Sequence, residues 1–162
     1  MTGSLAIGNP RAVRRRSRVG AFVAEVGLRW SDMDAFGHVN HARTVTLLEQ
    51  ARVQLLFSEA TRQGLPGMAE GVVVARVAID YHAPLGFDAG PLQVFLSVRD
   101  LRAASFVMDY SAYAHDSTAV ASAETLLVPY DVRGGRPRRL TEGERAFLAE
   151  WQVPAEREPN SA

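Results

Sequence analysis

Alternating apolar and polar positions characterise the first patterned part of the chain. From about Val19 to Trp30, apolar side chains fall at every second position, which is the period of a half-buried strand. Residues 42–63 contain no glycine or proline, and apolar residues recur there at helical spacing. A glycine and proline cluster at 64–67 then ends a helix of about 33 Å, at 1.5 Å per residue. The pattern therefore predicts a strand followed by one long helix.

Four further strand-like runs follow this helix. They cover residues 73–81, 92–98, 106–110 and 118–129. The first run should present one apolar face, formed by Val73, Ala75, Val77, Ile79 and Tyr81. Turn residues separate the runs, and links this short predict an antiparallel meander.

A sheet with one buried face and a long amphipathic helix each require an apolar partner. Wrapping the sheet around the helix satisfies both requirements. We therefore expect an α+β fold with a five-stranded antiparallel sheet around a long central helix. Thr141 and Glu144 form a capping box that predicts a short closing helix. An open sheet also leaves edge strands, so we expect a homodimer or homotetramer with sheets joined edge to edge.

The composition limits the chain to one domain. Its 162 residues are 47% apolar, enough for one core. Residues 1–18 predict a flexible basic arm, with a transit peptide as the alternative, and residues 154–162 a flexible tail. The domain itself should then cover residues 19–153.

Charge and cysteine content exclude several classes. The chain has no cysteine, which rules out disulfides, thiolate zinc sites and a cysteine nucleophile. Its 18 basic residues, all arginine, are balanced by 18 acidic ones, so net charge predicts neither nucleic-acid nor membrane binding. No apolar run has the roughly 20 residues needed to span a bilayer. We expect a cytoplasmic protein.

The chemistry of the chain is concentrated between the first strand and the long helix. The stretch reads Arg29-Trp30-Ser31-Asp32-Met33-Asp34-Ala35-Phe36-Gly37-His38-Val39-Asn40-His41. It holds two carboxylates, two of the four histidines and an asparagine. Loops held by rigid elements commonly carry binding and catalytic groups. This stretch is therefore the candidate functional site.

The same stretch, followed by a helix that carries Leu48-Glu49-Gln50-Ala51-Arg52, resembles the hot-dog acyl-CoA thioesterases of the 4-hydroxybenzoyl-CoA thioesterase type. The segment from Asp80 to Leu85 resembles the end of that family's second strand. The resemblance implies a hot-dog fold and hydrolysis of a coenzyme A or carrier-protein thioester, without a metal or other cofactor. It matches Asp34 to the catalytic carboxylate and the backbone N–H of His41 to the donor that polarises the thioester carbonyl.

A departure from the family pattern lies in the first turn of the helix. Members of the family commonly place a tyrosine where this chain has the run from Arg43 to Thr46. Smaller residues there leave the shape of the acyl pocket, and thus the preferred acyl group, open.

A carboxylate beside a helix N-terminus suits thioester hydrolysis. Asp34 can activate water or attack the carbonyl directly to give a mixed anhydride, while the N–H groups that open the helix hold the oxyanion. We favour water activation, because the side chains of Asn40 and His41 can orient the water. Gly37 would let the backbone approach the substrate, which His38 and Phe36 would contact.

Most of these residues also have a purely structural interpretation. Asp32 is expected to form a turn, Asp34 can do the same, and His38 can pack or cap. Glu49, a further candidate for substrate contact, can instead pair with Arg52 or Arg43.

Two other sets of residues have the same ambiguity. Trp30 and Phe36 can line an acyl pocket or belong to the core. Four arginines are candidates for binding coenzyme A phosphates or for a solvated turn, namely Arg133, Arg136, Arg138 and Arg139.

Two alternatives concern the whole protein. A hot-dog protein can bind acyl thioesters without hydrolysing them. A metal-binding module would use carboxylate and imidazole ligands from Asp32, Asp34, His38 and His41.

Overall fold

The computed structural model describes residues 20–153, so the expected basic arm and C-terminal tail lie outside the described residues. The strands are β1 (Phe22–Val26), β2 (Val72–Tyr81), β3 (Leu92–Arg99), β4 (Phe106–Tyr113), β5 (Ala119–Asp131) and the two-residue β6 (Arg136–Pro137). The helices are α1 (His41–Val53), α2 (Ala60–Arg62), α3 (Gly67–Glu70) and α4 (Glu142–Glu150). No helix among the described residues is long and apolar enough to cross a membrane.

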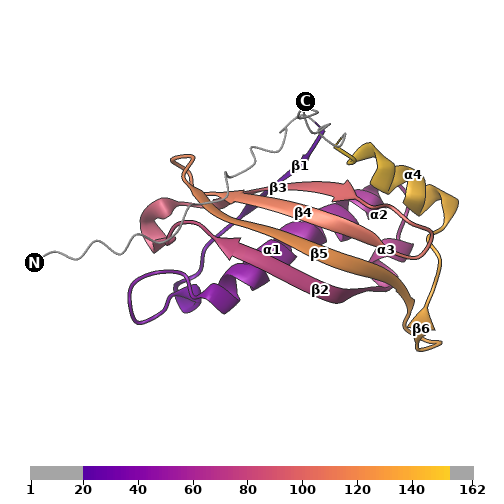
Figure 1. Cartoon of the computed structure of the whole chain (residues 1–162), viewed down its shortest axis with the longest axis horizontal. Helices are drawn as coiled ribbons and strands as arrows, with labels where there is room; N and C mark the ends of the chain where they lie inside the picture. The colour runs from indigo at the N-terminus through magenta and orange to yellow at the C-terminus, as the bar shows by residue number, and fades with distance from the viewer. Residues whose placement is uncertain (1–19, 154–162) are drawn as a thin grey trace, which may run out of the picture.

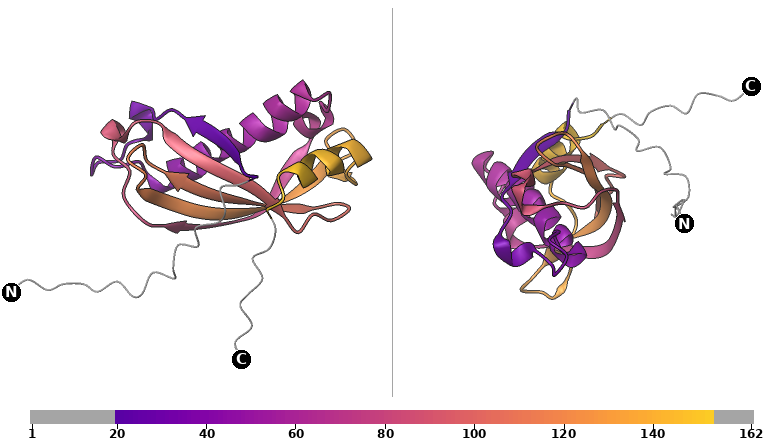
Figure 2. Two further views of the ribbon diagram at one scale, coloured as in Figure 1. Left: turned by 90° about the horizontal axis from the view of Figure 1, so that it is seen from above. Right: turned by 90° about the vertical axis from the view of Figure 1, so that its left-hand side faces the viewer.

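The long central helix runs along the concave side of the sheet (Figures 1 and 2). It begins with α1, continues through a π-helical segment (Gln54–Glu59) and ends with α2. Its buried face consists of apolar side chains, including Leu47, Leu48, Ala51, Leu55 and Leu56. The α+β hot-dog architecture expected from the sequence is thereby confirmed, with the closing helix at α4 and β6 as a short addition.

The order of the strands corrects the predicted meander. The sheet runs β1-β3-β4-β5-β2, all neighbours are antiparallel, and β6 pairs with β5. Only β3, β4 and β5 form a meander, because the chain crosses from β2 at one edge to β3 near the other. With this order β1 and β2 become the two edges that curl around the helix, as the end-on view of Figure 2 shows.

The first strand is shorter than predicted. It ends at Val26, where its partner strand β3 begins at Leu92, so no ladder remains for the residues beyond. Trp30 to Asp32 form a turn of 3₁₀ helix instead of strand.

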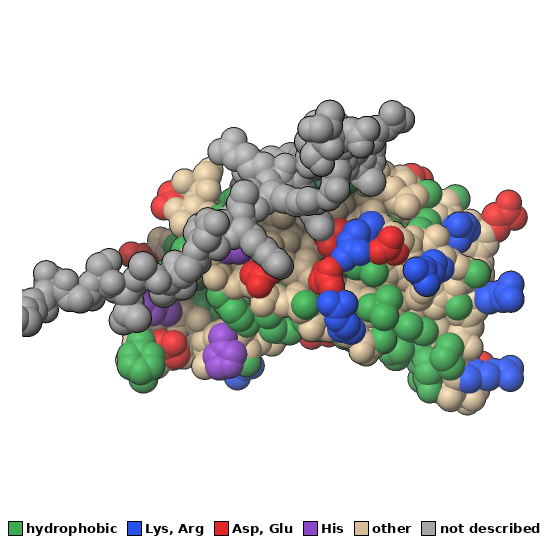
Figure 3. Space-filling view, viewed as in Figure 1, with side chains coloured by type: hydrophobic (Ala, Val, Ile, Leu, Met, Phe, Trp, Pro, Cys, Tyr) green, Lys and Arg blue, Asp and Glu red, His purple; other side chains and the backbone are tan. Residues whose placement is uncertain are grey.

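Strand β2 also differs from its predicted pattern. A bulge at Ala75 interrupts its register with β5, so the alternation of faces does not persist. As an edge strand it leaves Val73, Val74, Val77 and Tyr81 between 38% and 47% exposed. Figure 3 shows hydrophobic side chains along this border of the molecule. A ten-residue edge strand that exposes several large apolar side chains is unusual for an isolated monomer.

The outer face of the sheet is polar at its centre. Arg99 on β3 bonds Asp109 on β4 at 2.9 Å and also Glu124 on β5, which in turn pairs with Arg76 on β2. Figure 3 shows acidic and basic side chains gathered at the middle of this face. Because the outer face carries these charged side chains, the helix packs against the opposite, concave face of the sheet.

Helix α4 is fixed by a buried carboxylate. Glu144 is 2% exposed, accepts two bonds of 2.8 Å from the Arg138 guanidinium and completes the capping box with Thr141. Burial raises the pKa of Glu144, but its bonds from Arg138 and from the Thr141 backbone outweigh this and leave the pKa below its ordinary value. The same guanidinium reaches the Gly67 carbonyl, which ties α4 to α3.

We expect Glu144→Gln to lower the free energy of unfolding by about 2 kcal/mol, because the substitution leaves Arg138 without its charged partner. A folded-state pKa below the unfolded one means that Glu144 stabilises the protein above the unfolded pKa of about 4.3 and loses that contribution as pH falls. Urea denaturation at pH 7 and pH 4 should therefore show a smaller difference between wild type and variant at the lower pH. Exposed Glu142→Gln is the control, and an equal loss there would contradict the assignment.

Candidate functional site

The loop between β1 and α1 is a compact turn closed by its own backbone. Met33 and Val39 form an antiparallel bridge, and the Asp34 N–H donates to the His38 carbonyl at 2.7 Å. Gly37 has a φ of +78°, a conformation that strains residues with a Cβ, so the turn requires a glycine there. In Figure 1 this loop lies at the same end of the molecule as the start of α1.

One oxygen of the Asp34 carboxylate holds this turn together. Oδ1 accepts the backbone N–H of Phe36 at 2.8 Å and that of His38 at 3.1 Å. Oδ2 has no hydrogen-bond partner among residues 20–153. The His38 N–H is the strongest of the influences that lower the pKa of Asp34, and the Phe36 N–H adds to it. The carboxylate is therefore anchored, ionised and open on one side.

Asp32 has the structural role that the sequence allowed. Its side chain is 7% exposed and accepts the Arg29 backbone N–H at 2.9 Å, which closes the 3₁₀ turn. Its carbonyl accepts the Asn40 N–H at 2.9 Å and so holds the two ends of the loop together.

The start of α1 carries open donors. The Asn40 side chain caps the helix by accepting the Ala42 N–H at 2.9 Å, and the Asn40 carbonyl accepts the Thr44 N–H. Within the described part of the chain, the N–H groups of His41 and Arg43 have no acceptor. These donors lie at the positive end of the helix dipole and are suited to binding a negative oxygen.

Tyr81 is a site residue that the sequence reasoning missed. Its hydroxyl donates to the His41 carbonyl at 2.8 Å, and its ring lies edge-on to the His41 ring at 6.4 Å. Desolvation raises the pKa of Tyr81, which keeps this donor protonated. The edge strand β2 therefore fixes the first residue of α1, and an aromatic residue just before His82-Ala83-Pro84 was the available signal.

The aromatic side chains near the loop are surface residues. Trp30 is 77% exposed and Phe36 85% exposed, so neither belongs to the core of the chain. Trp30 packs edge-on against Phe87 at 5.6 Å.

Three other sequence candidates take different positions. Glu49 pairs with Arg52 at 3.2 Å, as its structural interpretation required, and is 59% exposed. The rings of His38 and His41 are on exposed residues. In the described ranges, no group of three or more His, Asp or Glu side chains is placed to hold a metal ion, so the four-ligand set is not assembled.

The four candidate arginines lie far from the loop. Arg138 bonds Glu144 and the Gly67 carbonyl, beyond the C-terminal end of the central helix, whereas His41 begins that helix. The helical segment from His41 to Arg62 spans about 33 Å at 1.5 Å per residue. Arg133, Arg136 and Arg139 are exposed near Arg138, at the end opposite the loop.

An anchored anion and unpaired helix N-terminal donors thus belong to one continuous segment, the loop and the first turn of α1. Such an arrangement can present an oxygen nucleophile or base to a carbonyl and stabilise the oxyanion that forms.

In comparisons with known proteins, the matching family model and the matching relatives whose names state an activity are those of thioesterases. The model of the thioesterase-like superfamily matches residues 28–152. The acyl-CoA thioester hydrolase YbgC of Escherichia coli O6:H1 is 29% identical over 128 residues, which cover 78% of this chain and 92% of that protein. A thioesterase from Thermus thermophilus, crystallised with coenzyme A and zinc, shares 26% identity at a TM-score of 0.66 over 82% of this chain and 94% of its own. A structure from Pseudomonas aeruginosa PAO1 shares 25% identity at a TM-score of 0.72 over 83% and 94%.

Proposed function

The chain belongs to the thioesterase-like superfamily, and from that membership we propose that it hydrolyses acyl-CoA thioesters to a free acid and the coenzyme A thiol. The observation that carries the proposal is the Asp34 carboxylate, which is anchored through Oδ1 in the loop that leads directly into the open N–H groups of α1. Carrier-protein thioesters have the same pantetheine thioester and are the second substrate class.

The two oxygens of Asp34 have separate roles in this proposal. Oδ1 is occupied by the Phe36 and His38 N–H groups and orients the carboxylate. Oδ2 attacks the thioester carbonyl carbon, a C–O bond forms, and the C–S bond breaks as the thiolate leaves. Water then hydrolyses the mixed anhydride, which returns the Asp34 carboxylate and releases the acid.

The lowered pKa of Asp34 favours direct attack over the activation of water. A general base works best when its pKa lies near the working pH. The bonds from His38 and Phe36 instead lower the pKa of Asp34, away from that pH. A nucleophilic carboxylate needs only to be ionised and placed.

The oxyanion binds at the start of α1. The His41 N–H is the donor in the position that the family resemblance indicates, and the Arg43 N–H lies in the same first turn. Asn40 keeps the Ala42 N–H occupied and so defines which donors remain open. Tyr81 holds the His41 peptide through its carbonyl, which fixes the direction of the neighbouring donors.

The proposed assembly is a homodimer formed through β2. This edge strand exposes Val73, Val74, Val77 and Tyr81. Antiparallel pairing of β2 with the same strand of a second copy satisfies the open backbone groups of both. Such a pairing is isologous and closes as a two-fold dimer. A tetramer would join two of these dimers.

Asp34→Asn should lower kcat/KM for acyl-CoA hydrolysis at least about 100-fold, since an amide neither attacks nor accepts the proton. The variant keeps the Oδ1 acceptor, so the turn should remain folded. Thiol release from a panel of short, medium, long and aromatic acyl-CoAs measures the effect and identifies the preferred acyl group. Asp116→Asn is the matched control, because Asp116 also caps its own turn, through the Thr118 N–H at 2.9 Å.

Equal rates for wild type and Asp34→Asn would place catalysis elsewhere and overturn the assignment. Tight acyl-CoA binding without thiol release by the wild type would favour the non-catalytic binding protein.

Val77→Glu should convert the dimer to a monomer at micromolar concentration, because it places like charges on the pairing edge. Sedimentation equilibrium measures the mass. Val23→Glu on β1, the opposite edge of the sheet, is the control and should leave the dimer intact. Dissociation by Val23→Glu alone would show that the other edge forms the interface.

A further inference from the structure

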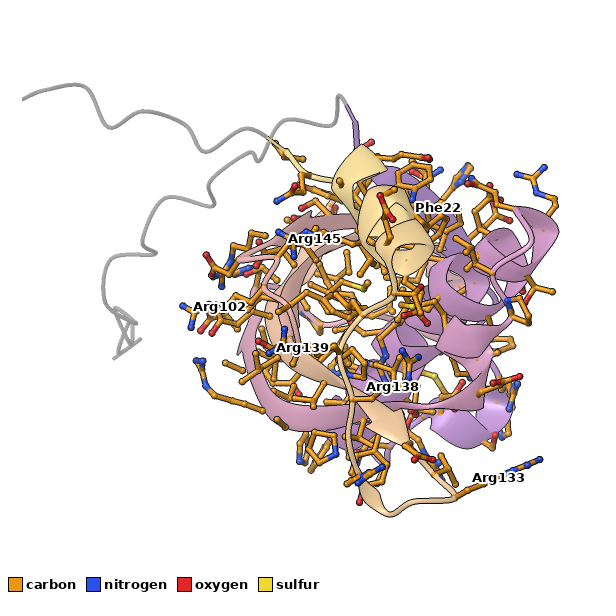
Figure 4. The ribbon with its side chains drawn as sticks, turned by 90° about the vertical axis from the view of Figure 1, so that its right-hand side faces the viewer. Phe22, Arg102, Arg133, Arg138, Arg139 and Arg145 are labelled. Atoms are coloured by element: carbon orange, nitrogen blue, oxygen red, sulfur yellow. The ribbon has the colours of Figure 1, made fainter. Side chains whose placement is uncertain are left out.

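The end of the molecule opposite the Asp34 loop carries a group of solvent-exposed arginines. They come from the β3–β4 loop, the β5–β6 hairpin, the segment after β6 and helix α4, and they are Arg102, Arg133, Arg136, Arg139 and Arg145. Within residues 20–153, none of them forms an ion pair with a carboxylate. Figure 4 looks onto this end and labels all of them except Arg136. We call these five residues the arginine face.

Two hydrogen bonds bring three of these arginines onto neighbouring segments. The Leu140 N–H donates to the Ala103 carbonyl at 2.9 Å. This bond places the backbones of Arg139 and Arg102 side by side, because each arginine is the chain neighbour of a bonded residue. The Arg145 guanidinium donates at 3.4 Å to the carbonyl of the residue before Arg102. Three like charges therefore share one part of the surface, where a bound anion would relieve their repulsion.

The β5–β6 hairpin adds two arginines and an apolar tip. Arg136 begins β6 and lies three residues before Arg139, a distance of about 10 Å in an extended chain. Val132 in the hairpin loop is 66% exposed and precedes Arg133. An exposed apolar side chain beside arginines suits a lipid surface, where the apolar group enters the boundary of the acyl chains and the guanidinium groups remain among the phosphates.

The carboxylates at this end are mostly withdrawn from the arginine face. Glu144 is 2% exposed and pairs with Arg138. Asp131 accepts the Gly134 N–H at 2.9 Å. The exposed carboxylates of α3 and α4, which form no ion pair with the five arginines, are Glu70, Glu142 and Glu150. Figure 3 accordingly shows mainly basic side chains at its right-hand end, where β6 lies in Figure 1.

The composition of this surface favours lipid headgroups over nucleic acid or protein. Single-stranded nucleic acids are bound by stacking on aromatic side chains, and protein interfaces are commonly anchored by aromatic residues. Of the described residues, the exposed aromatic side chains lie at the opposite end, by the loop and the start of α1, and are Trp30, Phe36, Tyr81 and Phe87. The arginine face offers charge and a small apolar tip instead.

We propose that the arginine face binds the anionic headgroups of a membrane surface, with Val132 entering the boundary between headgroups and acyl chains. Guanidinium groups donate paired N–H bonds to phosphate oxygens and remain charged at any working pH. Each basic residue close to an anionic bilayer raises the binding constant about fivefold. The net charge of zero does not reveal this surface, because net charge carries no information on where charges lie. This binding requires neither thioester hydrolysis nor a dimer.

Sedimentation of the full chain with vesicles tests the surface. The wild type should bind vesicles made of equal parts of phosphatidylglycerol and phosphatidylcholine, and not those of phosphatidylcholine alone. Arg102→Gln/Arg139→Gln/Arg145→Gln should weaken this binding about 100-fold, from about fivefold for each arginine. The corresponding triple lysine variant keeps the charge and should bind within about threefold of the wild type. Equal binding by the wild type and the glutamine variant would overturn the proposal.

A charge-matched variant tests whether position matters. Arg29→Gln/Arg43→Gln/Arg76→Gln removes the same net charge from exposed positions outside the arginine face. It should weaken vesicle binding by less than about threefold, because these side chains do not face the bilayer. A loss as large as that of the first glutamine variant would mean that net charge alone determines binding, and would contradict the proposal.

Ionic strength separates the charged contacts from the apolar one. Vesicle binding should fall as the Debye length shortens from about 30 Å at 0.01 M salt to about 8 Å at 0.15 M. At the higher ionic strength Val132→Ser should weaken the remaining binding about fivefold, because it removes the apolar contact. An unchanged binding constant in this variant would contradict the placement of Val132 in the bilayer boundary.

Two further measurements separate this proposal from the others. Binding to DNA in a mobility-shift assay, with no binding to anionic vesicles, would identify a nucleic-acid surface and overturn the proposal. Asp34→Asn should bind vesicles as the wild type does, because Asp34 lies at the other end of the molecule. The vesicle result therefore stands or falls independently of thiol release from acyl-CoA.

Discussion

Burial of one face of the central helix inside the curved sheet is the interaction on which the rest of the structure depends. Leu47 and Leu55 on this face are at most 1% exposed. A helix of this length gains most of its stability from such packing, not from its own propensity. Because the helix is held along its length, its N-terminus is fixed at one end of the sheet. The open N–H groups of the first turn are therefore presented at a defined place.

The loop before the helix meets its own polar requirements without help from the core. Asp32 and Asp34 accept N–H groups of their own turns, and Asn40 caps the helix. The backbone N–H groups of Phe36 and His38 favour the charged form of the Asp34 carboxylate at the surface. Tyr81 adds a long-range bond that ties the helix start to the sheet edge. The start of α1 and the edge strand β2 are therefore linked through Tyr81. Pairing of β2 with a second copy would change the surroundings of both.

Local periodicity predicted the elements well, because the helix and strands differ in period and are separated by glycine and proline. Periodicity did not predict the strand order, since the position of β2 beside β5 depends on pairs of residues that are 40 to 57 positions apart in the sequence. The bulge at Ala75 and the exposure of Val77 follow from that position and were missed for the same reason. The roles of Asp32 and Asn40 were available from turn chemistry. The bond from Tyr81 was not, because it forms only after the sheet curls around the helix.

The loop holds Asp34 as an anchored carboxylate with a lowered pKa, not as a carboxyl whose pKa is raised toward neutrality. An NMR titration of the ¹³C-labelled Asp34 carboxyl, assigned by comparison with Asp34→Asn, tests it most directly. We expect a midpoint below the ordinary aspartate value of about 3.9, because the His38 and Phe36 N–H groups favour the charged form. A midpoint raised toward neutrality would contradict it and identify Asp34 as a desolvated general base.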